Sequence, residues 1–233
     1  MKNIKYTFAI FFLFNSFTVF ANSWYQVEII IFDRINPDLS EERWSNKEPS
    51  FRLDTIELNP NYEMNSEKTL IPFMIMDEKY NRMSGVHRIL KLSSEYRPLV
   101  HLSWQQPATK QSESRYVHIV KNDSSEIILE KEDQESIIEP EFLEEFSTNK
   151  KVIDGSIRIR SSFYLHVDID LYYFKDLYDS DNTYTNDTEI LDQNIEQLIV
   201  EIKESRKIKL NEIHYFDNPV YGVILQVSRL GES

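Results

Sequence analysis

Residues 204–227, ESRKIKLNEIHYFDNPVYGVILQV, decide the fold of this 233-residue chain. They place a charged strand, a turn that contains His214 and Pro219, and an apolar closing strand within one short segment. Apolar and polar residues alternate along both strands, as they do in strands that bury one face. The segment therefore predicts a hairpin that completes a β-sheet.

Three earlier stretches also predict strands. Residues 24–32, WYQVEIIIF, carry bulky apolar side chains on both faces, which indicates a central strand. Residues 96–107, YRPLVHLSWQQP, alternate between apolar and polar side chains after an opening proline. Residues 156–173 follow the turn signal Asp154-Gly155 and keep one apolar phase. They predict one long strand with a polar face.

Two helices are expected beside this sheet. Residues 83–94 repeat apolar side chains at spacings of three and four, with Ser84 as the N-cap. Residues 188–195 predict a second helix, after which β-branched residues indicate a strand that reaches Leu210. Residues 33–76 contain scattered prolines and predict a long surface loop.

The expected fold class is therefore α+β, a mainly antiparallel sheet of about five to seven strands with one or two helices packed on it. Residues 22–233 are expected to form a single domain with an acidic insertion around residues 107–151. Within that insertion, residues 115–120 predict a short strand and residues 140–146 predict a helical turn.

The N-terminal residues predict export. Lys2 and Lys5 precede a mostly apolar run, and Val19-Phe20-Ala21 has the small residues of a cleavage site. Residues 1–21 are therefore expected to be a signal peptide cleaved after Ala21, which leaves a periplasmic protein without a membrane anchor. The chain has no cysteine, so neither a disulfide nor a lipid-bearing cysteine is expected.

Charge and composition exclude several functions. The formal charge of −13 becomes −15 when residues 1–21 and their two lysines are removed, which argues against a nucleic-acid partner. The chain has only four glycines, and they form no phosphate-binding or dinucleotide-binding loop. No GxSxG, HExxH or cysteine nucleophile occurs. We expect no enzyme activity and no cofactor, although a Ser-His-Asp triad built from distant residues stays open.

Two polar residues stand on predicted strands. Glu28 either pairs with an arginine at the rim of the sheet or serves as a binding-site charge. His101 is expected to be a hydrogen-bonded histidine of the sheet.

The polar face of residues 156–173 presents His166, Asp168 and Asp170 in a row. This row either binds a metal or pairs with basic side chains of a neighbouring strand, for which Arg206 and Lys207 are candidates. Glu204 and Arg206 share one face and either form an ion pair or hold a ligand carboxylate.

Several stretches together resemble the CsiV-type family of periplasmic peptidoglycan-binding proteins of gamma-proteobacteria. They are WYQVE at 24–28, YRPLVH at 96–101 with Trp104 and Gln106, RIR at 158–160 with YLHVD at 164–168, ESRK at 204–207, and EIHYFD at 212–217 with Pro219 and Gly222. Lys207 and Lys209 replace expected arginines, and Asn218 replaces an expected histidine. A lysine keeps the charge and loses the planar fork.

The resemblance implies a non-enzymatic protein that binds peptidoglycan and supports cell-wall assembly and cell shape. The implied partner is an outer-membrane lipoprotein that activates a bifunctional penicillin-binding protein. A strongly acidic protein needs a local basic face for the carboxylates of peptidoglycan, and the clustered basic residues are Arg158, Arg160, Lys203, Arg206, Lys207 and Lys209.

The expected binding residues combine these basic positions with the aromatic turn: Arg206, Lys207, Lys209, His214, Tyr215, Arg158, Arg160 and Glu204. No metal site is assigned. The alternatives are a periplasmic protein-interaction adaptor that does not bind glycan and a cell-wall hydrolase.

Overall fold

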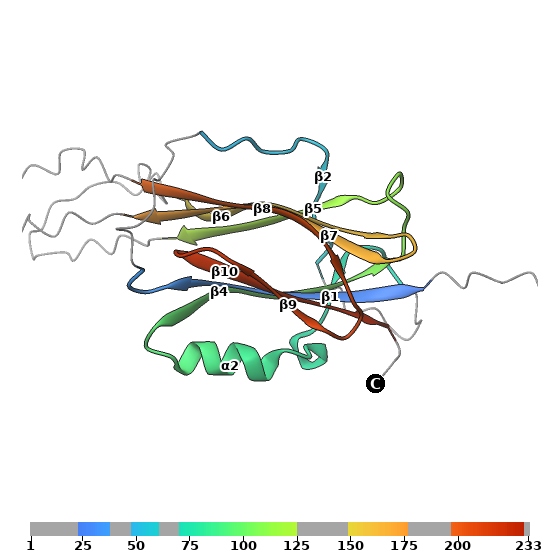
Figure 1. Ribbon diagram of the computed structural model, residues 1–233, viewed down its shortest axis with the longest axis horizontal. Coiled ribbons are helices and arrows are strands. Elements are labelled where there is room, and N and C mark those ends of the chain that lie inside the picture. Colours follow the sequence, from blue (N-terminus) through green and yellow to red (C-terminus); the bar gives the residue numbers. More distant parts are fainter. Residues whose placement is uncertain (1–22, 38–47, 61–69, 125–148, 177–196, 231–233) are drawn as a thin grey trace, which may run out of the picture.

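Two facing β-sheets make up the described part of the protein (Figure 1). The computed structural model describes residues 23–37, 48–60, 70–124, 149–176 and 197–230. The predicted signal peptide at 1–21, the helical turn at 140–146 and the helix at 188–195 lie outside these residues. No helix in the described ranges is long and apolar enough to cross a membrane.

The first sheet has the strand order β3-β4-β1-β10-β9. Its members are β3 (Met74–Ile75), β4 (Tyr96–Pro107), β1 (Trp24–Arg34), β10 (Tyr221–Arg229) and β9 (Ile213–Asp217). Neighbouring strands are antiparallel throughout. The prediction that residues 24–32 form a central strand is confirmed, because β1 lies between β4 and β10.

The second sheet has the order β2-β5-β6-β7-β8. Its members are β2 (Thr55–Ile56), β5 (Tyr116–Ser124), β6 (Asn149–Ser161), β7 (Leu165–Asp176) and β8 (Gln197–Ile208). β2 pairs in parallel with β5, and the other pairs are antiparallel. β5 and the start of β6 fall within the expected insertion, and residues 125–148 lie outside the described part.

The main core fills the space between the two sheets. Alternate residues of β1, such as Val27, Ile29 and Ile31, are fully buried against the inward faces of β6 and β7. Fully burying such a side chain contributes about 1.5–3 kcal/mol. The predicted alternation in β10 is confirmed, since Val223 and Leu225 are also fully buried.

A second, smaller core lies on the other face of the first sheet. The helix α2 (Ser84–Leu92) covers this face, and Ile30 and Phe32 of β1 pack there with Met83 and Leu90 (Figure 1). The predicted helix on the sheet is confirmed. Ser84 is not its N-cap: Met83 holds that position, and Ser84 Oγ donates a hydrogen bond to the carbonyl oxygen of Asn81 at 3.1 Å.

The fold roughly fits the expected α+β class, but it has more strands than the five to seven that were expected. The ten strands of the described residues form two sheets with one α-helix, together with a 3-10 turn η1 (Glu78–Tyr80). The expected loop at 33–76 also contains the short strands β2 and β3, which are too brief for sequence alternation to reveal.

Residues 156–173 form two strands and not one. β6 and β7 pair from Ile153↔Tyr173 to Ser161↔Leu165, so the chain reverses in between. The odd number of turn residues preserves the apolar phase, which made two strands look like one. The Asp154-Gly155 turn was wrong as well. Gly155 lies inside β6. The position requires glycine, because a Cβ there would clash with the Asp170 carbonyl oxygen and lie 2.7 Å from Leu171 Cα.

Residues 204–227 are divided between the sheets and do not form one hairpin. Their charged strand belongs to β8 of the second sheet, whereas β9 and β10 form a hairpin of the first sheet. Asn211 makes the crossing with a positive φ of 62° and donates a backbone hydrogen bond to Val227 at 2.8 Å. The segment therefore joins the two layers.

Candidate functional site

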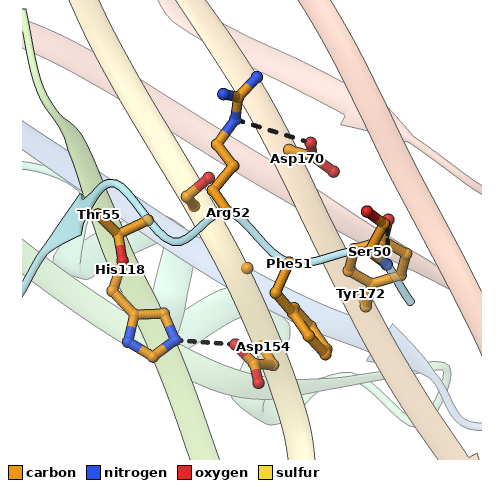
Figure 2. A pocket seen from close by; sticks show the side chains of 10 residues that line it. Ser50, Phe51, Arg52, Thr55, His118, Asp154, Asp170 and Tyr172 are labelled. Carbon is orange, nitrogen blue, oxygen red and sulfur yellow. Dashed lines mark hydrogen bonds and ion pairs between the residues drawn. The ribbon is translucent and has the colours of Figure 1, made fainter.

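The outer face of the second sheet carries the polar side chains that its strands turn away from the core. A segment before β2 crosses this face, with Arg52 directed toward Asp170 and Phe51 directed the other way (Figure 2). The Ser50 backbone N–H donates to the Tyr172 hydroxyl at 3.3 Å, and the Phe51 and Tyr172 rings meet edge to face at 5.4 Å. These contacts fix the crossing segment onto β7.

A groove of about 200 Å³ opens beside the crossing segment. We call it the outer-face groove, and its lining residues are Arg52, Tyr116, Arg158, Asp168, Ile169, Asp170, Lys203, Glu204 and Ser205. Strands β5, β6, β7 and β8 each contribute at least one of them. The groove therefore depends on the register of the whole sheet.

Tyr116 forms the centre of the groove. The guanidinium carbon of Arg52 lies 3.9 Å from the centroid of its ring, and that of Arg158 lies 4.2 Å from it. Tyr116 is only 8% exposed. Guanidinium groups are attracted to aromatic faces, so the ring orients both cations.

Asp168 holds the basic side chains of β6 in place. Its carboxylate accepts hydrogen bonds from Arg158 Nε at 2.8 Å, Arg160 Nε at 3.0 Å and Ser205 Oγ at 2.5 Å. Burial raises the pKa of Asp168, but the hydrogen bonds from Arg160, Ser205 and Arg158 outweigh it and leave the pKa below its usual value. Asp168 is therefore a charged structural partner.

Asp170 is held less completely. Lys203 Nζ donates to its Oδ2 at 2.8 Å, and this hydrogen bond raises the pKa of Lys203. Asp170 is 7% exposed. Among the residues that the structure describes, no donor lies within hydrogen-bond distance of its Oδ1. A buried acceptor without a donor costs about 1–3 kcal/mol, so this oxygen is a place where a ligand donor is favoured.

Arg52 forms two long ion pairs and no hydrogen bond to their carboxylates. In the described part of the chain, its nearest carboxylate oxygens are Asp54 Oδ1 at 3.9 Å and Asp170 Oδ2 at 4.0 Å, both beyond hydrogen-bond distance. Its side chain is 38% exposed. The stacked guanidinium can therefore present its donors to a ligand carboxylate.

A small cavity of about 20 Å³, the size of a water site, lies on the other side of the crossing segment (Figure 2). His118 borders it, with Nε2 2.8 Å from Asp154 Oδ1 and Nδ1 2.5 Å from Glu57 Oε1. Burial lowers the pKa of His118, but the two carboxylates more than compensate and raise it. Because both ring nitrogens face carboxylates, His118 is poorly suited to act as a general base.

The expected binding residues do not lie in one place. Arg158 lines the outer-face groove, and Arg160 is tied to it through Asp168. Glu204 also borders the groove, but its side chain lies on the other face of β8. Lys207 lies on the same outer face, with Nζ above the Tyr164 ring.

Glu204 and Arg206 form an ion pair, and the ion-pair alternative is thereby confirmed. Their side chains project toward the core side of β8, an edge strand, where Arg206 reaches the first sheet. Its NH1 donates to the Tyr215 carbonyl at 3.0 Å, and its guanidinium lies over the Phe216 ring. Arg206 thus links the layers.

The aromatic turn has different neighbours. Lys209 Nζ donates to Glu212 Oε1 at 2.9 Å, and the Lys209 backbone N–H donates to His214 Nε2 at 3.2 Å. The Tyr215 side chain points to the opposite face of the first sheet, where its ring stacks with Phe32. The turn and the outer-face groove therefore lie on different surfaces.

In the row of His166, Asp168 and Asp170 the two aspartates pair with basic side chains, as one alternative expected, but the suggested partners were wrong; His166 Nδ1 lies 3.2 Å from the Tyr164 carbonyl oxygen. Asp168 pairs with Arg158 and Arg160, and Asp170 pairs with Lys203. Arg206 and Lys207 take no part. In the described ranges no three His, Asp or Glu side chains are grouped as a metal site would require.

Glu28 does not pair with an arginine side chain at the rim. It is 1% exposed beneath the start of α2. Its carboxylate accepts the backbone N–H groups of Arg82 at 2.7 Å and Met83 at 2.9 Å, and His101 Nε2 lies 2.8 Å from Oε1. The expected hydrogen bond of His101 is confirmed. Glu28 anchors the helix, since an anion is stabilised at a helix N-terminus.

Sequence reasoning missed Arg52, Tyr116 and Ser205 as members of the site. Arg52 comes from a stretch without periodicity, and no local signal connects it with β7. Tyr116 alternates with the buried Val117 on β5, which could have placed it on the outer face once the strand was recognised.

The fold and the groove together define a two-sheet protein with a mixed-charge groove on the outer face of one sheet. The chain belongs to the family described as peptidoglycan-binding protein, CsiV, whose family model matches residues 4–230. The resemblance seen in the sequence is thereby confirmed. The family is described by what it binds and not by a reaction. No curated protein and no solved structure gives a significant match to the chain.

Proposed function

We propose that this protein binds peptidoglycan without chemically altering it, and that the outer-face groove is the binding surface. The observation that carries the proposal is Arg52, whose guanidinium carbon lies 3.9 Å from the centroid of the Tyr116 ring and whose Nε lies 4.0 Å from Asp170 Oδ2; the other oxygen of Asp170 has no donor in the described structure. Such a groove is suited to a polar ligand, which can take the donors of Arg52 and, once that partly exposed side chain moves, reach the buried acceptor of Asp170. The family description supplies the ligand class.

Local charge makes this surface compatible with an acidic protein. Arg52, Arg158, Arg160 and Lys203 gather around the groove, although the whole chain has a formal charge of −13. Asp168 and Asp170 lie among these cations, so the groove carries both signs of charge, and its cations can attract a ligand carboxylate within a Debye length of about 8–10 Å. The carboxylates of peptidoglycan stem peptides fit such a cluster.

The proposal places the protein in the periplasm, after a signal peptide at 1–21 is cleaved following Ala21. There it supports cell-wall assembly through an outer-membrane lipoprotein activator of a bifunctional penicillin-binding protein. The basic n-region, the apolar run and the small residues before the cleavage site support export. The activator rests on the resemblance to the family alone.

The test is co-sedimentation of the purified mature protein with sacculi. Arg52→Glu should lower binding at least 10-fold, because it removes a charged donor and repels the ligand carboxylate; each tenfold change corresponds to about 1.4 kcal/mol. The matched control is Arg206→Glu with Lys207→Glu, which reverses the charge of two basic residues of β8 outside the groove; we call these two residues the basic flank of β8. That variant should sediment like the unaltered protein.

The same samples separate the competing functions. If the unaltered protein stays in the supernatant, peptidoglycan binding is refuted, and crosslinking to a periplasmic partner would support an adaptor. If Arg206→Glu with Lys207→Glu loses binding and Arg52→Glu retains it, the site lies on the basic flank of β8. Altered muropeptides after incubation would indicate a hydrolase.

A further inference from the structure

We infer that the outer-face groove recognises an amino-acid centre, with an ammonium and a carboxylate on one carbon, and not the sugar chain. The inference rests on the proposed function, because peptidoglycan stem peptides carry such a centre at the free end of their diamino acid. Arg52 would bind the carboxylate, and Asp170 would bind the ammonium.

The carboxylate half of the site is Arg52. A guanidinium binds a carboxylate through two parallel N–H donors, and the guanidinium carbon of Arg52 lies over the Tyr116 ring, 3.9 Å from its centroid. Arg158, on the same ring, is already committed, with Nε donating to Asp168 at 2.8 Å. Of these two stacked cations, Arg52 is therefore the one that can take a ligand.

The ammonium half of the site is Asp170. Its Oδ2 already accepts from Lys203, whereas Oδ1 has no donor in the described structure. An ammonium has three N–H donors and suits an ionised acceptor of this kind. The side chain of Arg52 lies beside this carboxylate and is partly exposed, so it has room to move as the ligand enters.

The two halves lie side by side. Arg52 Nε is 4.0 Å from Asp170 Oδ2, close enough for attraction and too far for a hydrogen bond. A ligand with both charges on neighbouring atoms can lie antiparallel to this pair and satisfy each partner. A ligand with only one charge satisfies one partner and leaves the other without its hydrogen bonds, which costs affinity.

The groove lacks the usual feature of a sugar site. Sugars pack against open aromatic faces, and Tyr116 lines the groove with its ring already in contact with two guanidinium groups. The nearby Phe51 and Tyr172 rings pack against each other. The polar pair of Arg52 and Asp170 is therefore a better determinant of recognition than ring stacking.

The test uses sacculi whose free amines have been acetylated, which converts each ammonium into a neutral amide and leaves the glycan unchanged. Binding of the mature protein should fall at least 10-fold relative to untreated sacculi. Acetylation also makes the sacculi more negative and repels any acidic protein. Asp170→Asn is therefore the matched control, because it should already bind weakly and should change less than twofold on acetylation.

A second measurement identifies the recognised group. Free meso-diaminopimelate should displace the protein from sacculi, whereas pimelate, which lacks the amines, and 1,5-diaminopentane, which lacks the carboxylates, should be at least 10-fold less effective. Arg52→Gln, a change on a partly exposed side chain, should weaken binding to untreated sacculi at least 10-fold even if Asp170→Asn proves poorly folded.

The outcomes distinguish this inference from the proposed function. Equal binding to acetylated and untreated sacculi, or an equal loss in the unaltered protein and Asp170→Asn, would overturn amino-acid recognition while peptidoglycan binding stands. Absence of binding to untreated sacculi would overturn the proposed function itself.

Discussion

Glu28 and Asp170 are both acidic side chains buried on the outer face of a sheet, and they differ in how completely they are bonded. Glu28 lies under α2 on the first sheet and receives two backbone N–H donors and His101. Asp170 lies in the groove of the second sheet, and only one of its oxygens has a hydrogen-bond donor in the described structure. The comparison teaches that burial alone does not distinguish a structural carboxylate from a binding one.

The covering of the two faces explains the difference. Helix α2 closes the first face, and Arg82 and Met83, which lead into it, bring backbone donors to Glu28. The second face is crossed only by the segment before β2, which brings Phe51 and Arg52 and leaves a groove. The polar contacts of the first face therefore serve the fold, whereas the proposed ligand site lies on the second face.

The largest expected effect comes from Glu28→Gln. An amide oxygen replaces only one carboxylate oxygen, and its NH₂ would face a backbone N–H, so we expect a loss of about 3 kcal/mol in the free energy of unfolding. Urea unfolding measures the loss. The matched variant Asp170→Asn should lose less than about 1 kcal/mol, because its partner Lys203 is well exposed. A greater loss for Asp170→Asn would break the comparison.

Gly155→Ala should have the next largest effect. The new methyl group would meet the backbone of β7 at Asp170 and Leu171, and forcing the strands apart should cost about 2 kcal/mol. It should also weaken sacculus binding, since it displaces Asp170. Gly85→Ala is the control, because nothing lies within 4 Å of a Cβ there and the change should stabilise α2 by about 0.5 kcal/mol. Thermal unfolding of both variants checks the contrast.

Two histidines should give the two faces opposite pH dependences. Burial, with the nearby charges of His101 and Lys91, lowers the pKa of His87 in α2, whereas at His118 burial lowers the pKa and the two nearby carboxylates more than compensate and raise it. The stability contributed at His118 is present below its unfolded pKa of about 6.5 and is lost as pH rises through the raised value. At His87 the folded state binds fewer protons, so stability is lost as pH falls through about 6.5.

The free energy of unfolding between pH 5.5 and 8 measures these contributions. Relative to the unaltered protein, His118→Gln should lose stability mainly at the acid end, and His87→Gln should gain it there. Changes of the same sign in both variants would contradict the assignment.

The smallest expected effect belongs to Arg206→Ala. The residue links β8 to β9 through its contacts with Tyr215 and Phe216, but it is half-exposed, and such pairs contribute about 0.5 kcal/mol. Chemical unfolding should show that small loss, and sacculus binding should stay within twofold of the unaltered protein. A tenfold loss of binding without a stability change would move the site to the basic flank of β8.

The alternation of apolar and polar residues predicted many of the strands. β1, β4 and β8 lie where alternation predicted strands, because each buries one or both faces and so repeats every two residues. The turn between β6 and β7 escaped notice since its odd length keeps the phase across the reversal. Half of the groove could also be anticipated, because Arg158, Asp168 and Asp170 stand out as charges on a regular strand.

By itself, the sequence determined which residues form strands, which face of each strand is apolar, and the family to which the chain belongs. These properties depend on local periodicity and on ordered motifs, both of which are written along the chain. Only the tertiary structure decided that residues 204–227 are shared between two sheets and that Glu28 caps a helix. It also brought Arg52 to Tyr116 and Asp170, residues separated by long stretches of chain. Such contacts depend on how the sheets and the crossing segment pack, and no local pattern specifies that packing.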